Sequence, residues 1–154
     1  MTKEMKQEFT LRISQANKSG MVVILYEMLL AYLEDAQVSL NEAGDYRSDL
    51  TKARKCLHEL RNSLHFEYAL AYQLLQLYIY VDKLISRADI SGKQETITEA
   101  ISIIRRLHDA YEQISQQDTS EPVMGNTQQV YAGLTYGKKS LCENRNDGNR
   151  GFLV

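Results

Sequence analysis

The chain has 154 residues, which is the length of one domain with one substantial core. Its contents of 44% hydrophobic and 25% charged residues exclude a chain that is disordered throughout. A net charge of −2 excludes the broad basic field that binding to nucleic acid requires, so no nucleic-acid partner is expected. The longest apolar run, MVVILY at 21–26, is far shorter than the roughly 20 residues of a membrane span, so we expect none.

The cysteines and the N-terminus indicate the compartment. Cys56 and Cys142 lie far apart in the sequence, and no apolar run follows the opening MTKEMKQEF as it would in a signal peptide. We therefore expect a cytoplasmic protein with free thiols.

The first predicted elements are a short N-terminal segment and a long helix. Residues 1–18 contain an amphipathic turn or two, whose apolar members are Phe9, Leu11 and Ile13. Residues 21–43 are predicted to form a helix, because apolar residues recur every three or four positions. These are Val22, Leu25, Leu29, Leu33, Ala36 and Leu40. Asn17 or Ser19 is expected to cap this helix and Gly44 to end it.

The middle of the chain repeats this rhythm. A second helix is predicted from Ser48, with Ser48 or Asp49 as its cap, and its apolar residues are Leu50, Ala53, Leu57, Leu60 and Leu64. Residues 62–67 (NSLHFE) are predicted to form a bend. A third helix follows from about Phe66, and we assign its core-facing positions to Leu70, Leu74, Leu77, Val81, Leu84 and Ala88.

The last predicted helix begins after residues 89–96 (DISGKQET) and ends near Gln117. Its apolar residues are Ile97, Ile101, Ile104, Leu107, Tyr111 and Ile114. Short connections force neighbouring helices to run in opposite directions. The predicted fold class is therefore all-α, an antiparallel four-helix bundle over residues 19–117 with a short N-terminal helical segment and an irregular C-terminal tail.

Residues 118–154 form that tail in our interpretation. They are rich in Gly, Asn, Gln, Ser and Asp, and their isolated apolar residues are Val130, Tyr131, Leu134, Tyr136 and Leu141. Such a sequence buries too little for an independent fold. Two interpretations stay open: the tail is loosely held, or it lies in a groove of the bundle as a built-in substitute for a partner.

No catalytic, cofactor or metal motif is complete. HEL at 58–60 begins like the zinc motif HExxH, but Asn62 stands in place of the second histidine. AGLTYGKKS at 132–140 is similar to a phosphate-binding loop, but Ala132 and Lys139 replace its first glycine and its hydroxyl residue. The predicted core is aliphatic and lacks the Glu-x-x-His pairs of a di-iron site. We expect a binding protein that is not an enzyme and has no cofactor or metal.

The third helix carries more apolar surface than a bundle requires. Tyr78 and Ile85 lie on one flank of its assigned stripe, where they belong either to the edge of the core or to a groove. Tyr72, Ile79 and Tyr80 project away from that stripe. Such a patch indicates a surface where the apolar side chains of a partner dock.

Three stretches together resemble the flagellar secretion chaperone family FliS. They are SGMVVILYEMLLAYLEDA at 19–36, ARKCLHELRNSLHFE at 53–67 and LLQLYIYVDKLISRADISG at 74–92. The resemblance implies a cytoplasmic four-helix bundle that binds the disordered C-terminal segment of flagellin and keeps it from polymerising before export. Other flagellar export proteins are further candidate partners. The N-terminal segment is expected to cover part of the apolar surface when no partner is bound.

The resemblance and the surplus apolar surface give one set of expected partner-binding residues. They are Tyr26, Leu57, Leu60, Leu64, Tyr72, Tyr78, Ile79, Tyr80, Leu84 and Ile85. The alternative function is that of a small helical regulatory or ligand-binding bundle with a closed internal pocket and no chaperone role.

Overall fold

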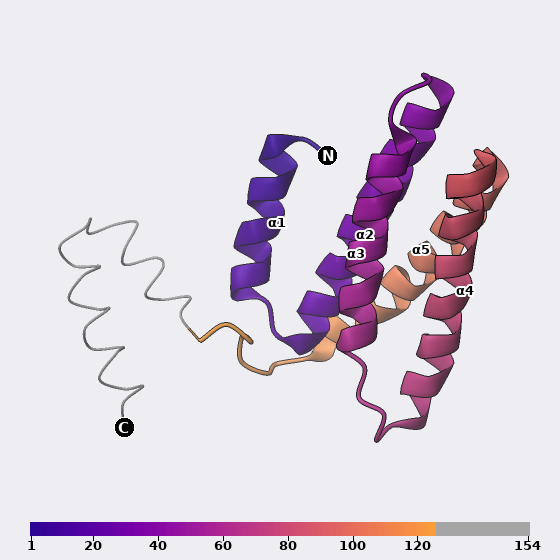
Figure 1. Cartoon of the computed structure of the whole chain (residues 1–154). Helices are drawn as coiled ribbons and strands as arrows, with labels where there is room; N and C mark the ends of the chain where they lie inside the picture. The colour runs from indigo at the N-terminus through magenta and orange to yellow at the C-terminus, as the bar shows by residue number, and fades with distance from the viewer. Residues whose placement is uncertain (126–154) are drawn as a thin grey trace, which may run out of the picture.

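The computed structural model describes residues 1–125, which form five helices (Figure 1). They are α1 (Lys3–Gln15), α2 (Lys18–Asn41), α3 (Tyr46–Asn62), α4 (Ala69–Ser91) and α5 (Gln94–Gln117). No strand occurs between residues 1 and 125, and the predicted all-α class is confirmed. Helices α2 to α5 form the bundle, and α1 packs against α2. None of these five helices is both long and apolar enough to cross a membrane.

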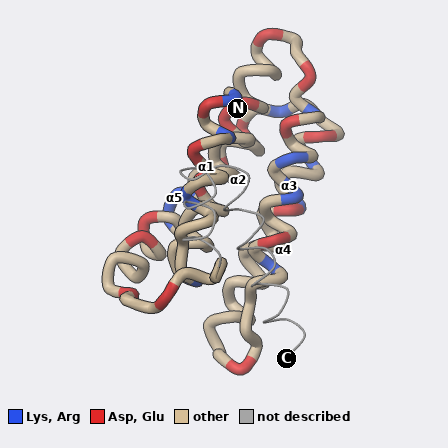
Figure 2. The backbone as a smooth tube through the Cα atoms, turned by 90° about the vertical axis from the view of Figure 1, so that its left-hand side faces the viewer, with Lys and Arg blue, Asp and Glu red and all other residues tan. Residues whose placement is uncertain are grey.

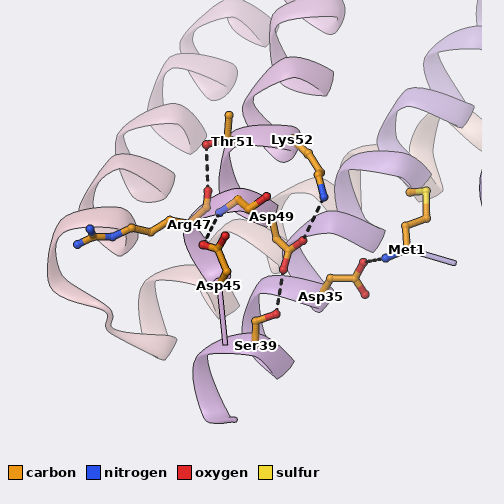
Figure 3. Close-up of polar contacts among 9 residues, drawn as sticks. Met1, Asp35, Ser39, Asp45, Arg47, Asp49, Thr51 and Lys52 are labelled. Carbon is orange, nitrogen blue, oxygen red and sulfur yellow. Dashed lines mark hydrogen bonds and ion pairs between the residues drawn. The ribbon is translucent and has the colours of Figure 1, made fainter. Parts of the chain in front are cut away.

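Capping side chains fix the starts of α2 and α3. Asn17 caps α2 by accepting a hydrogen bond from the backbone N–H of Gly20 at 2.9 Å, as one of the two expected candidates. The cap of α3 is Asp45, which accepts from the N–H of Ser48 at 3.2 Å (Figure 3). The expected cap at Ser48 or Asp49 was wrong, because these residues already lie in the first turn of α3.

The connection from α2 to α3 differs from the expected glycine stop. Helix α2 ends at Asn41, and the residue in the left-handed conformation is Ala43, with φ 57°. Asp49 of α3 then accepts a hydrogen bond from Ser39 of α2 at 2.9 Å, which ties the two helices together beside the turn (Figure 3). Gly44 follows Ala43 and closes the turn, because its backbone N–H donates to the Ser39 carbonyl at 2.6 Å.

The other boundaries mostly agree with the sequence. The bend at 62–67 is confirmed, because α3 ends at Asn62 and α4 begins at Ala69. Helix α5 ends at Gln117 as predicted but begins at Gln94, three residues before Ile97. The N-terminal segment is a full helix of 13 residues, capped by Thr2 and anchored by the buried ring of Phe9, where one or two turns were expected.

Helix α4 faces the core with a different stripe from the predicted one. Ala71, Tyr78 and Ile85 are buried, whereas Leu70 and Leu77, assigned to the core, are 53% and 38% exposed. Both stripes share four residues, Leu74, Val81, Leu84 and Ala88, all of which are buried. Apolar residues occupy both sets of positions, so periodicity alone did not determine which side turns inward.

Helices α4 and α5 meet at Gly92 and diverge along their length, so the first half of α4 stands apart from α5 (Figure 1). In the half of α4 nearer to Gly92 the two helices are still in contact, and the Tyr80 hydroxyl donates to Glu99 of α5 at 2.5 Å. Further along α5, the ring of Tyr111 packs against Tyr26 of α2 with 5.6 Å between ring centroids. The end of α5 thus packs against α2. The first half of α4 therefore lacks a neighbouring helix on the side that faces α5.

Candidate docking site beside the first half of α4

The first half of α4 is free of charged side chains. Residues 68–81 contain no Asp, Glu, Lys or Arg, and this part of the tube is tan in Figure 2. Six large side chains in this stretch are between 37% and 65% exposed. We call them the α4 apolar face: Tyr68, Leu70, Tyr72, Leu77, Ile79 and Tyr80.

The α4 apolar face has two flanks. Leu70 and Leu77 are seven residues apart and share the flank that looks toward α5. Tyr72 and Ile79, also seven apart, share the opposite flank, and the Tyr72 ring packs against Phe66 of the preceding loop at 5.2 Å between centroids. Large apolar side chains that gather on a surface often mark a place where a partner docks, so the α4 apolar face is a docking candidate.

A pocket of about 490 Å³ adjoins the Leu70 flank, and we call it the α4 pocket. Its walls come from the start of α2, the loop between α3 and α4, α4 itself, the end of α5 and the residues that follow it. Its apolar lining residues are Met21, Val22, Leu64, Tyr68, Leu70, Ala71, Leu74, Tyr78, Tyr111 and Val123. The exposure of Tyr68 and Leu70 shows that the pocket reaches the surface, unlike the closed internal pocket of the alternative function.

Three tyrosines form the inner side of this site. Tyr26 and Tyr78 are almost fully buried and their hydroxyls hydrogen-bond to each other, while Tyr111 packs edge-on against Tyr26. Burial raises the pKa of Tyr78 to about 12 and also raises the pKa of Tyr26 and Tyr111. All three hydroxyls therefore stay neutral at physiological pH. Tyr78 and Tyr111 line the pocket, and Tyr26 packs behind them.

The ten expected partner-binding residues separate into three groups by burial. Six lie in the core with at most 1% of their surface exposed: Tyr26, Leu57, Leu60, Tyr78, Leu84 and Ile85. Leu64 is half-buried and lines the α4 pocket together with Tyr78. Tyr72, Ile79 and Tyr80 are exposed on the α4 apolar face. The bundle itself covers the six core residues, so for Tyr78 and Ile85 the structure favours the core over an open groove. A binding role for the set stays a prediction.

Sequence reasoning missed three residues of this site. Leu70 and Leu77 were assigned to the core, and Tyr68 was not singled out, although it is 65% exposed. The signal that could have found them is the absence of charge from residue 68 to residue 81, because a helix with one solvated face normally carries charged residues there.

Helix α1 covers a different surface from the α4 apolar face. The ring of Phe9 lies beside Leu30 and Ala31 of α2, and Arg12 forms an ion pair with Glu27 of α2 at 2.5 Å. The N-terminal ammonium group of Met1 pairs with Asp35 further along α2 (Figure 3). No α1 residue lines the α4 pocket, so in this conformation α1 shields α2 and leaves the pocket open.

One cluster among the described residues has the composition of a metal site. His108, Asp109 and Glu112 offer ligand atoms within 4.8 Å of one another. Both ring nitrogens of His108 already have partners, Asp109 at 3.0 Å and Glu27 at 3.2 Å. The cluster is therefore explained as an ion-pair network between α2 and α5.

The comparison with known families gives one match. The family model described as flagellar protein FliS matches residues 1–118. The match includes all five helices and ends directly after α5. No curated protein matches the chain.

Proposed function

We propose, because the chain belongs to the FliS family of flagellar proteins, that it binds the C-terminal segment of flagellin and prevents its polymerisation before export. The family is one of export chaperones in flagellum biogenesis and not of enzymes, so the chain has a chaperone role. Beyond this role we propose three details: the client is flagellin, binding takes place in the cytoplasm, and the residues named below make the contact.

The observation that carries the proposal is the α4 apolar face beside the α4 pocket. A disordered client segment that folds against the first half of α4 buries its own apolar side chains and those of the α4 apolar face together. Burial of one large apolar side chain contributes about 1.5–3 kcal/mol before other costs. The entropy lost when the client becomes ordered offsets much of this gain, which keeps the complex releasable at the export apparatus.

The expected binding residues take three roles in this proposal. Tyr72, Ile79 and Tyr80 contact the client directly, and Leu64 and Tyr78 form the inner lining of the α4 pocket. The other core members support the shape of the site from behind: Tyr26, Leu57, Leu60, Leu84 and Ile85. Substitution of a supporting residue is expected to weaken folding and binding together, whereas substitution of a contacting residue weakens binding alone.

A matched pair of isoleucines in α4 tests the proposal. Ile79 is 37% exposed on the α4 apolar face, and Ile90 is 82% exposed near the other end of the same helix. Binding of a peptide from the C-terminal segment of flagellin is measured by isothermal titration for the wild-type chain, Ile79→Glu and Ile90→Glu. We expect Ile79→Glu to weaken binding at least tenfold, since a buried carboxylate is costly, and Ile90→Glu to bind like wild type.

Circular dichroism of both variants checks that the helices remain folded. Equal affinities for the two variants would place the client elsewhere on the bundle. If the wild-type chain does not bind the peptide at high micromolar concentration, flagellin is not the client.

A further inference from the structure

The residues that follow α5 turn back to the junction between α1 and α2. The side-chain amide of Asn17 donates to the backbone carbonyls of Asp118 at 3.2 Å and Ser120 at 3.3 Å. The Ser19 hydroxyl donates to the Asp118 carboxylate at 2.5 Å. The α2 cap therefore also anchors the chain after α5, which gives residues 118–125 a fixed path. We call these eight residues the C-terminal strap.

The C-terminal strap brings the chain to the α4 pocket. The backbone N–H of Val123 donates to the carbonyl of Ala16 at 2.9 Å, and the Val123 side chain lines the α4 pocket. Leu70 and Tyr68 line the same pocket from α4. The strap thus supplies one apolar side chain to the pocket, and the chain leaves the strap at Gly125 only two residues later.

Residues 126–154 continue from this position, and we call them the tail. Their structure lies outside the described residues, but their sequence is known, and it contains the apolar residues Val130, Tyr131, Leu134, Tyr136 and Leu141. The tail has four cationic residues and two acidic ones, so its net charge is +2 and that of residues 1–125 is −4. The family match ends at residue 118, so the tail is an addition to the shared helices.

We propose that the tail binds in cis to the α4 pocket and the α4 apolar face, where it competes with the client. Its apolar side chains take the place of those of the client, and its positive charge favours contact with the acidic remainder of the chain. A short connection from the strap gives the tail an effective concentration of order millimolar at the pocket, so weak contacts are sufficient. A client must displace the tail, so its apparent affinity is its intrinsic affinity multiplied by the fraction of molecules in which the site is free.

Native Cys142 reports the position of the tail. His65→Cys places a thiol at the exposed rim of the α4 pocket, and Ile90→Cys places one near the far end of α4. Cys56 is buried, and burial raises its pKa to about 11, so it competes little for oxidation. After mild oxidation of the full-length variants, mass spectrometry measures the intramolecular disulfides of Cys142. We expect at least a tenfold preference for position 65 over position 90.

Proximity of the strap to the pocket favours position 65 even for an unbound tail, so a matched control is needed. The same two cysteine variants are made with Tyr131→Ser, Leu134→Ser and Tyr136→Ser, which remove apolar contacts and keep the tail length and charge. Loss of most of the preference in this serine tail supports the proposal. The same preference in both tails would overturn it, as would disulfide-linked dimers as the main product.

The effect on the client rests on the proposed function and has its own measurement. The flagellin C-terminal peptide is titrated into the full-length chain with the native tail and with the serine tail. Tighter binding by the serine tail, by about fivefold or more, supports competition, and equal affinity would overturn it. If neither chain binds the peptide, the proposed function fails, while the cross-linking result still decides whether the tail occupies the pocket.

Discussion

Tyr26 of α2 and Tyr78 of α4 hydrogen-bond through their hydroxyls inside the core, where 0% and 1% of their surfaces are exposed. Each hydroxyl is the polar partner of the other, so either Tyr→Phe change leaves one buried hydroxyl without its partner. We expect Tyr26→Phe or Tyr78→Phe to lower the free energy of unfolding by about 1–3 kcal/mol.

The double variant Tyr26→Phe/Tyr78→Phe should cost less than the sum of the two single changes, because it leaves no unpaired hydroxyl. Urea denaturation of the four proteins in a double-mutant cycle measures this difference. Additive costs would show that the two hydroxyls do not depend on each other.

The same pair predicts how stability responds to alkaline pH. Burial raises the pKa of Tyr78 to about 12, although its hydrogen bond with Tyr26 opposes this rise. Burial, then the charge interaction with Tyr78 and the hydrogen bond between the two hydroxyls, raise the pKa of Tyr26. An unfolded tyrosine ionises near pH 10. The contribution of these groups is therefore fully present below about pH 10 and is lost as the pH rises from there through the folded-state pKa values.

We expect the free energy of unfolding to fall steeply from about pH 10 to about pH 12, and less steeply in the double phenylalanine variant. Urea denaturation across this range checks the slope. Parallel curves for the two proteins would contradict the assignment to Tyr26 and Tyr78.

Glu27 connects α1 to the bundle, and its charge network predicts a second pH dependence. Burial alone raises the pKa of Glu27, but hydrogen bonds from Arg12 and His108 outweigh this effect and lower it. Burial likewise lowers the pKa of His108, but its hydrogen bonds to Asp109 and Glu27 outweigh this effect and raise it. The lowered pKa of Glu27 stabilises the fold above about pH 4.5 and the raised pKa of His108 stabilises it below about pH 6.5.

The free energy of unfolding should therefore be largest between these two pH values and fall as the pH rises through the folded-state pKa of His108. Urea denaturation at pH 6 and pH 8 measures it, and Glu27→Gln should flatten this dependence. Glu27→Gln should also lower the hydrogen-exchange protection of the α1 amides, because it removes the ion-pair partner of Arg12. Unchanged protection would show that the Phe9 contact alone holds α1.

Two positions with positive φ give opposite predictions for stability. Gly92 ends α4 with φ 62°, and a Cβ there would lie 3.4 Å from the Tyr46 hydroxyl, so Gly92→Ala should cost about 1 kcal/mol or more. Ala43 adopts φ 57° in the exposed turn after α2, so Ala43→Gly should stabilise by up to about 1 kcal/mol. Thermal unfolding should show melting temperatures that move a few degrees in opposite directions.

The sequence by itself determined the number and kind of bundle helices and several of their limits. Asn17 has a side chain that caps a helix, the bend at 62–67 interrupts the apolar rhythm, and the polar residues after Gln117 end it. These features depend on neighbours within a turn or two along the chain, so local physical chemistry predicts them. The three stretches that resemble FliS also gave the family, which the match over residues 1–118 confirms.

Only the tertiary structure decided which side of α4 is buried and where the docking candidate lies. Leu70 and Leu77 are as apolar as Ile85, and nothing in their spacing shows which residues turn inward. The choice depends on residues distant in sequence: the Tyr78 hydroxyl finds that of Tyr26, 52 positions earlier in the chain, and α5 turns away to pack on α2. Because that divergence removes a neighbour from the first half of α4, Leu70 and Leu77 remain at the surface.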